Sequence, residues 1–272
     1  DAATKKSEGK FATDYTAFLK PDALKGARIG IARDFLGQDA EVDWVVESSL
    51  AAMRHAGATV VDVRFPKWLL DAKGEFYTAL RYPEFTVQIQ QYLATLKPGY
   101  PKTLAEMIAR SDKMASTRPD GAGPNAPRWN LFKRELASGS IDDPGYVAVH
   151  EHGLALVTAL LDGAFTANTL DAIVYPTSSR RPEFINAPPD TPGGGSASGS
   201  NLANLSGFPD LIVPAGFTTD RLPVGLSFVG RAFTEGRLLG LGYAFEQATK
   251  ARRRPAHTPA LPGETLPIKP TG

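Results

Sequence analysis

Cysteine is absent from this chain of 272 residues. Its absence excludes disulfide bonds, thiolate zinc sites and a cysteine nucleophile. Long apolar runs are also missing: no stretch approaches the roughly 18 to 20 residues that cross a bilayer, so we expect no membrane span. The first ten residues are polar and charged, unlike a signal peptide. We therefore expect a soluble protein, with the compartment open between cytoplasm and periplasm.

A surplus of charge of one sign is the next feature that the chain lacks. Its 30 Lys and Arg residues nearly cancel 29 Asp and Glu residues, which leaves a net charge of +1. Such a balance gives no electrostatic reason to expect a nucleic-acid partner. Hydrophobic residues make up 42% of the chain, which is enough for one large packed domain.

The first third of the chain has the pattern of a strand–helix–strand unit. The apolar run at 28–32 predicts a buried strand, 41–55 has apolar residues at helical spacing, and 59–65 alternates as a second strand. Short loops between these elements predict two parallel strands with a right-handed crossover. The turn at 33–37 lacks the glycine fingerprint of dinucleotide-binding units, so we expect this unit to be scaffolding.

The rest of the chain alternates between helical and strand patterns. Its predicted elements are a helix opened by the capping box at 103–106, a long helix at 143–168, a strand at 171–176, a short helix at 201–205, strands at 211–217 and 224–229, and a last helix capped by Thr234. Together these elements predict an α/β fold with a mixed β-sheet covered by helices.

Two short motifs invite a chemical interpretation. His150 and His152 flank Glu151, but zinc-binding helices place histidines four residues apart on one face, so we expect no metal here. The Gly/Ser-rich run at 193–200 contains no G-x-S-x-G and no phosphate-binding loop. It is either a flexible loop that leads into a helix or a loop that borders a substrate.

The C-terminal third carries a longer and more specific pattern. Residues 204–217 read N-L-S-G-F-P-D-L-I-V-P-A-G-F, and 222–230 read L-P-V-G-L-S-F-V-G. These segments resemble the C-terminal motif of the amidase signature family, with Ser227 in place of the usual glutamine. The strand at 171–177 resembles the family's D-x-(apolar)-x-P-T element, and 84–108 looks most like the bacterial peptide amidase branch.

The resemblance implies a fold and a division of labour. Residues 1–254 would be the C-terminal part of a single amidase domain, and 255–272 a proline-rich tail. The family uses a serine nucleophile, a bridging serine and a lysine base, with no cofactor and no metal. The stretch that carries those groups is the N-terminal half of the family, and no part of this chain matches it. The resemblance therefore implies a chain without a catalytic residue.

The same resemblance implies three substrate-binding residues. The segment before the N-x-x-x-x-P motif lines the acyl side of the pocket in a mammalian member of the family, which aligns Ala197 and Asn201 with the pocket wall. Thr177, at the end of the D-x-x-x-x-P-T strand, is the third. Asn204 is expected nearer the core than Asn201, in a capping or loop role.

Three functions remain open at this point. The first is amide hydrolysis by a larger protein, in which this chain meets the missing N-terminal half and a small-molecule amide or peptide amide substrate. The second is the A subunit of a tRNA-dependent amidotransferase, which shares the motif and works together with a partner protein. The third is a non-catalytic binding or scaffold domain.

Overall fold

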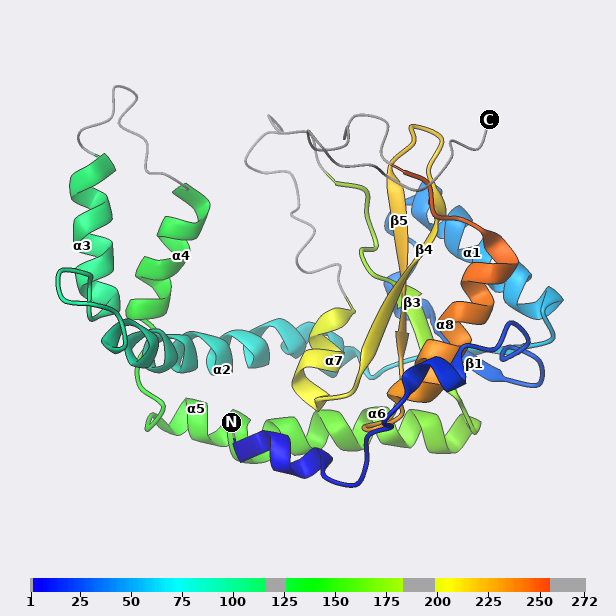
Figure 1. Cartoon of the computed structure of the whole chain (residues 1–272), viewed down its shortest axis with the longest axis horizontal. Helices are drawn as coiled ribbons and strands as arrows, with labels where there is room; N and C mark the ends of the chain where they lie inside the picture. The colour runs from blue at the N-terminus through cyan, green and yellow to red at the C-terminus, as the bar shows by residue number, and fades with distance from the viewer. Residues whose placement is uncertain (1, 116–125, 183–198, 255–272) are drawn as a thin grey trace.

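One mixed sheet lies at the centre of the computed structural model, which describes residues 2–115, 126–182 and 199–254 (Figure 1). The strand order is β2–β1–β3–β5–β4. The strands are β1 (Arg28–Ala32), β2 (Thr59–Val63), β3 (Ala172–Pro176), β4 (Asp210–Phe217) and β5 (Pro223–Val229). β1 runs parallel to β2 and β3, whereas β5 is antiparallel to β3 and β4. The predictions of a parallel first pair and a mixed sheet are confirmed.

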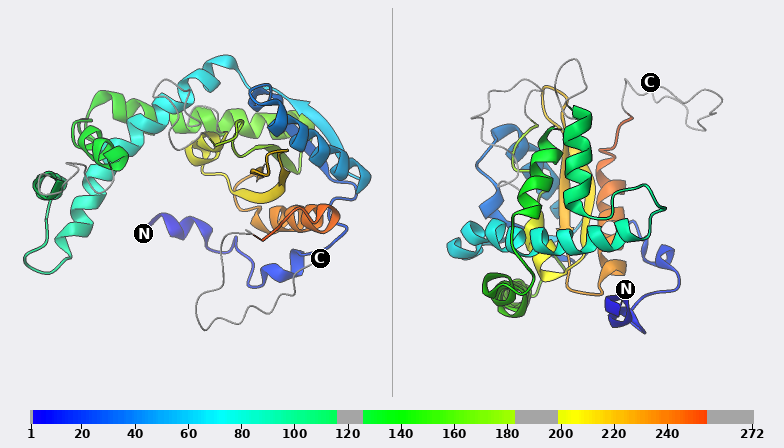
Figure 2. Two further views of the ribbon diagram at one scale, coloured as in Figure 1. Left: turned by 90° about the horizontal axis from the view of Figure 1, so that it is seen from above. Right: turned by 90° about the vertical axis from the view of Figure 1, so that its left-hand side faces the viewer.

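Helices cover both faces of this sheet (Figure 2). They are α1 (Ala40–His55), α2 (Lys67–Ala94), α3 (Leu104–Ala115), α4 (Ala126–Leu136), α5 (Pro144–Ala148), a π-helical turn η4 (Val149–Gly153), α6 (Leu154–Asn168), α7 (Ser200–Ser206) and α8 (Glu235–Thr249), with short 3-10 turns η1 (Ala2–Ser7), η2 (Tyr15–Phe18) and η3 (Arg33–Phe35). α1 and α8 pack on one face, and α2, α6 and α7 pack on the other.

The side chains of β3 show why its sequence is apolar without interruption. Ala172 and Val174 enter the core beneath α1 and α8, whereas Ile173 and Tyr175 enter the core beneath α6 and α7. A strand buried on both faces needs apolar residues at successive positions rather than at alternate ones. The central place of β3 therefore follows from its composition.

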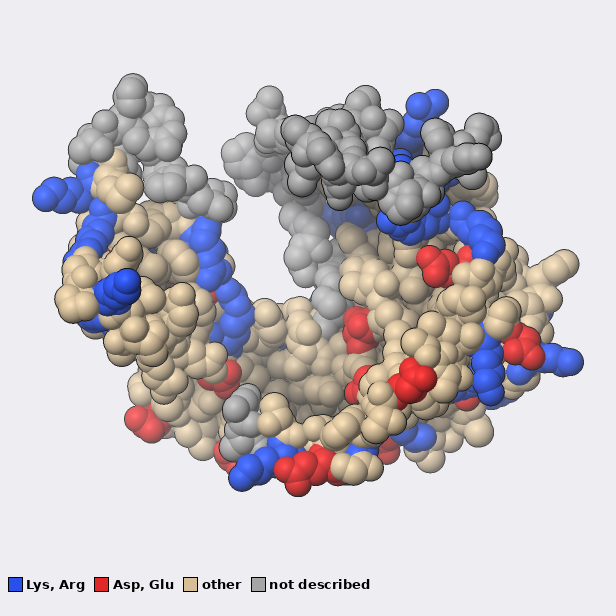
Figure 3. Space-filling model, viewed as in Figure 1, with Lys and Arg blue, Asp and Glu red and all other residues tan. Residues whose placement is uncertain are grey.

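The helices α3 and α4 form an arm that stands away from the sheet at the end of α2 (Figure 2). The predicted capping box opens α3: the Glu106 amide donates to Thr103 Oγ1 at 3.1 Å, and the Glu106 carboxylate accepts from the Lys102 amide at 2.8 Å. Figure 3 shows a hollow between this arm and the sheet, with Lys and Arg side chains gathered along α4. The arm thus forms one side of a concave face.

One detail of the predicted helices is wrong: Thr234 precedes α8 without capping it, because its hydroxyl donates to the Arg231 carbonyl at 2.7 Å instead. The long helical segment predicted at 143–168 is confirmed, with one π-helical stretch, η4, that holds His150 and His152. Among the described residues, no helix is long and apolar enough to cross a membrane. The proline-rich tail at 255–272 lies outside the described residues.

Candidate functional site

Thr177 lies directly after β3, where the sheet meets a small cavity. Its amide donates to the Gly225 carbonyl at 2.9 Å, and its Oγ1 lies 3.0 Å from Ser227 Oγ. These contacts hold the half-buried threonine against β5. The cavity has a volume of about 280 Å³ and is also lined by Arg180, Arg181 and Ile212. Thr177 therefore occupies a cavity wall, and its contact with a substrate stays a prediction.

The segment after Thr177 is tied to the start of α1. Arg181 Nε donates to Asp39 Oδ2 at 2.9 Å, and Arg180 Nε donates to Gln38 Oε1 at 3.1 Å. Asp39 also caps α1 by accepting from the Glu41 amide at 3.0 Å. Burial alone would raise the pKa of Asp39, but the hydrogen bonds from Arg181 outweigh it and hold the pKa below its usual value. These hydrogen bonds tie the segment at the cavity rim to the start of α1.

The short helix α7 carries the second predicted residue. Asn201 is half-buried in its first turn, whereas Asn204 is exposed and lines a cavity of about 340 Å³ with Tyr77 and Arg81 of α2. The expectation that Asn204 lies nearer the core is wrong. The helix buries Leu202, Ala203 and Leu205, which turns Asn204 toward the hollow.

The third predicted residue, Ala197, lies outside the described residues, as does most of the Gly/Ser-rich loop. The described chain resumes at Gly199, the residue before α7. Thr177 lines the cavity of about 280 Å³, whereas Asn201 lines neither this cavity nor the one of about 340 Å³. No lysine lines either of the two cavities, so this wall offers hydrogen-bonding groups but no serine–lysine pair.

A row of hydrogen-bonded side chains was missed in the sequence. Tyr175 Oη donates to Asp210 Oδ2 at 2.6 Å, and Ser227 lies beside both groups and beside Thr177. Burial, followed by the charge of Asp210, raises the pKa of Tyr175. Burial also raises the pKa of Asp210, although its hydrogen bonds to Tyr175 and Ser227 oppose that shift. We call Tyr175, Asp210, Ser227 and Thr177 the polar row.

The polar row could have been suspected from strand alternation. Tyr175 of β3 and Thr177, which follows the strand, are two residues apart and share a face of the sheet, and Ser227 is the register partner of Tyr175 on β5. Asp210 opens β4, in which Leu211, Val213 and Ala215 alternate toward the core beneath α1 and α8, so Asp210 lies on the opposite face. The sequence shows these polar residues, but it does not predict that they contact one another, because those contacts depend on the order of the strands in the sheet.

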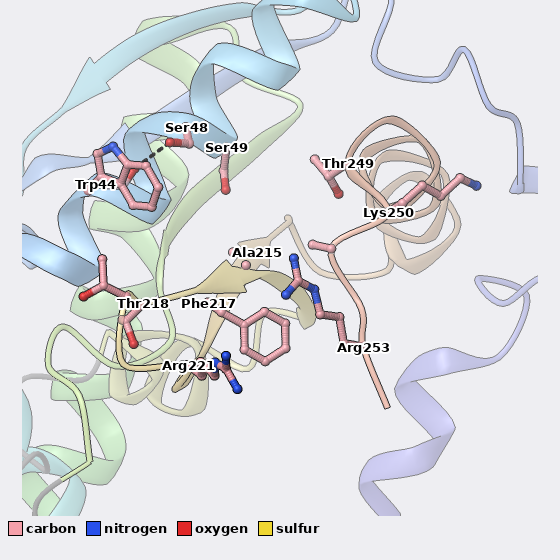
Figure 4. A pocket seen from close by; sticks show the side chains of 13 residues that line it. Trp44, Ser48, Ser49, Ala215, Phe217, Thr218, Arg221, Thr249, Lys250 and Arg253 are labelled. Carbon is pink, nitrogen blue, oxygen red and sulfur yellow. Dashed lines mark hydrogen bonds between the residues drawn. The ribbon is translucent and has the colours of Figure 1, made fainter. Parts of the chain in front are cut away.

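A separate cavity of about 600 Å³ lies where α1, β4 and the end of α8 meet (Figure 4). None of the predicted residues lines it. Its buried Ser49 hydroxyl donates to the Val45 carbonyl one turn earlier, and Thr249 donates likewise to Phe245. Lys250 points away from the cavity, and Arg253 lies over the Phe217 ring at 5.3 Å. The two hydroxyls are thus paired with backbone carbonyls of their own helices, and we assign this cavity no role in the chemistry.

No obvious set of metal ligands is present in the part of the chain that the structure describes. No group of three or more His, Cys, Asp or Glu side chains there is arranged to hold an ion. His150 Nδ1 lies 2.8 Å from Glu151 Oε1 at the surface, and its ring stacks on Tyr146. These contacts involve His150 and Glu151 of the His-Glu-His motif.

Comparison with known proteins shows which family this chain is similar to. The profile of the family described as Amidase matches residues 2–239. Among curated proteins, the A subunit of glutamyl-tRNA(Gln) amidotransferase from Thermoanaerobacter pseudethanolicus is 29% identical over 254 residues, which cover 89% of this chain and 48% of that protein. The chain thus spans about half the length of the curated relatives it matches.

Two solved structures are similar in both sequence and fold. The native peptide amidase from Stenotrophomonas maltophilia is 31% identical, with a TM-score of 0.68 over 88% of this chain and 46% of that one. A peptide amidase in complex with the competitive inhibitor chymostatin is 32% identical, with a TM-score of 0.73 over 88% and 47% of the two chains.

Proposed function

The chain belongs to the amidase family, and from that premise we propose that it is the substrate-side part of a serine amide hydrolase that cleaves carboxamide C–N bonds. The observation that carries the proposal is the wall built by the end of β3, by β5 and by α7. Thr177 lines a cavity at this wall, Asn201 is half-buried in the first turn of α7, and no lysine lines the two cavities beside them. A wall of this kind binds and orients a substrate without attacking it.

The reaction needs groups that this wall does not supply. A serine hydroxyl attacks the amide carbon after a neutral lysine takes its proton, and an acyl-enzyme forms as the amine leaves. Backbone amides beside the nucleophile stabilise the oxyanion. We propose that these groups come from another segment of the same protein, and that Thr177, Ala197 and Asn201 bind the substrate opposite them.

The edge strand β4 supports such an assembly. In the described residues no strand pairs with its outer edge, and Ile212 on this strand is 55% exposed. An open edge with an exposed apolar side chain favours pairing with further strands. The chain covers only about half the length of its relatives, so a second half of the same protein is the partner that we propose for this edge.

Two versions of this function differ in the substrate. The similarity to peptide amidases favours a stand-alone hydrolase of peptide amides or small-molecule amides. The similarity to the A subunit of the amidotransferase favours a glutamine-dependent enzyme that works with a partner. The identities of 32% and 29% are too close to decide between them. A non-catalytic scaffold is the outcome if neither activity is present.

The test is an assay of the protein encoded by the full reading frame, purified without any partner. We expect release of ammonia from peptide amides, inhibited competitively by chymostatin. Hydrolysis of glutamine that requires a second protein would support the amidotransferase instead. No amide hydrolysis under either condition would refute the proposal and leave the scaffold role.

A further inference from the structure

Two members of the polar row are buried on one face of the sheet. Tyr175 is 2% exposed and Ser227 is fully buried, yet both lie on the sheet face that α7 and α6 cover with apolar side chains. Polar groups buried in such a place are stable only when they are hydrogen-bonded to one another. The row therefore has a defined geometry that crosses three strands, β3, β4 and β5.

One end of the row touches the segment that enters α7. A Cβ built on Gly199 would lie 2.6 Å from Tyr175 Cδ2 and 2.7 Å from Cε2, so the glycine backbone rests directly on the ring. The ring is itself held by the hydrogen bond to Asp210 at 2.6 Å and by Phe35 at a centroid distance of 5.4 Å. The position of Tyr175 thus sets the position of the first turn of α7.

The other end of the row is Thr177. Ser227 Oγ lies 3.0 Å from Thr177 Oγ1, and Ser227 also hydrogen-bonds the pair formed by Tyr175 and Asp210. Hydrogen bonds therefore link Thr177 to Tyr175, and the packing of Gly199 on the Tyr175 ring extends this link to the segment that precedes Asn201. These are the two parts of the proposed substrate wall, although Asn201 does not line the cavity of Thr177.

The row is not optimised for stability. Asp210 Oδ1 is buried and has no hydrogen-bond partner among the described residues, and burial raises the pKa of this carboxyl group. An apolar replacement of the whole row would avoid both costs. Unfavourable arrangements of this kind are found where function requires a fixed geometry.

We propose that Tyr175, Asp210 and Ser227 are positioning residues that fix Thr177 and the start of α7 relative to each other for amide binding. The inference rests on the proposed function, because it assigns the wall to an amide substrate. Tyr175 acts through Gly199 and Asp210 acts through Tyr175, so neither residue needs to contact the reacting atoms.

The experiment compares Tyr175→Phe and Asp210→Asn in the full-length protein with the control Ser49→Ala. Ser49 is equally buried, but it lies on α1 at the opposite face and donates only to the Val45 carbonyl. For peptide amides we expect KM to rise about tenfold in each row variant, with kcat nearly unchanged. A tenfold change corresponds to the free energy that one hydrogen bond to a charged group contributes. Combining both changes should raise KM by less than the product of the two effects, because the row acts as a unit. A wild-type KM in Tyr175→Phe, or an equal rise in Ser49→Ala, would overturn the inference.

A second measurement separates this inference from the proposed function. Hydrogen exchange of residues 199–206 needs no substrate, and the Leu202 amide donates to the Gly199 carbonyl at 3.0 Å in the segment concerned. We expect exchange there to be about tenfold faster in Tyr175→Phe and unchanged in Ser49→Ala. If the wild-type protein hydrolyses no amide, the proposed function fails, but unchanged exchange in Tyr175→Phe overturns the positioning role on its own.

Discussion

Replacement of Gly199 by alanine perturbs the contact on which the proposed substrate wall depends. The backbone of Gly199 has φ −78° and ψ −17°, which alanine adopts without strain. On backbone grounds alone the change would stabilise the protein by about 0.4 to 1 kcal/mol. The new Cβ, however, would lie 2.6 Å from Tyr175 Cδ2, whereas carbon atoms prefer separations of about 3.5 to 4.0 Å. The two groups must therefore separate by roughly 1 Å.

The strand side of this contact resists the movement. Tyr175 is held by Asp210 and Phe35, so the start of α7 has to shift. Overpacking of this kind costs about 1 to 3 kcal/mol. For a chain of this size that lowers the melting temperature by roughly 2 to 12 °C. A displacement of about 1 Å at a substrate wall lowers kcat/KM by about 100-fold.

The assay combines thermal melts with kcat/KM for a peptide amide in the full-length protein. Gly163→Ala on α6 is the matched control, because no atom lies within 4 Å of the Cβ position there, and it should be neutral or stabilising. In a Tyr175→Val background, Gly199→Ala should cost no further stability, since the ring is gone. A Gly199→Ala protein with wild-type melting temperature and kcat/KM would refute the reasoning.

Three further outcomes are expected. Gly207 ends α7 with φ +70°, so Gly207→Val should lower the free energy of unfolding by about 1 to 3 kcal/mol, and an unchanged melt would contradict this. Asn201→Leu should change the ratio of kcat/KM between small and large acyl amides by about 10- to 200-fold, whereas equal losses with a lowered melting temperature would make Asn201 structural. Burial raises the pKa of Asp210 in the folded state. The charged carboxylate therefore destabilises the folded protein at a pH above the ordinary pKa of aspartate, and this loss of stability shrinks as the pH falls. Asp210→Asn should therefore gain more melting temperature relative to wild type at pH 8 than at pH 4, and a gain that is larger at pH 4 would contradict the sign.

Local patterns predicted most of the elements of this fold. Apolar periodicity placed α1 and the strands β1 and β2 within two residues of their observed ends, and short connections predicted the parallel pairing of the two strands. The left-handed backbone of Gly207, with φ +70°, lies between the short helix α7 and the strand β4, a place where glycine is the usual residue. These features depend on neighbours in sequence, which is why a single sequence reveals them.

The arrangement of the site depended on contacts that are distant in sequence. Tyr175 and Asp210 are 35 residues apart and meet only because β5 lies between β3 and β4. The exposures of Asn201 and Asn204 were assigned the wrong way round, because the burial of α7 is set by the helices that it packs against. The Thr234 hydroxyl donates to the preceding Arg231 carbonyl instead of capping α8. The local sequence is compatible with either hydrogen bond and does not predict which one forms.

The most direct test of the central claim compares this 272-residue chain with the full-length protein in one assay. The claim is that the chain contributes the substrate wall, while the nucleophile and its base lie in another segment. Release of ammonia from a peptide amide should be undetectable for the chain alone and measurable for the full-length protein. Turnover by the chain alone, abolished by Ser196→Ala or Ser198→Ala, would contradict the account and place the nucleophile in the Gly/Ser-rich loop.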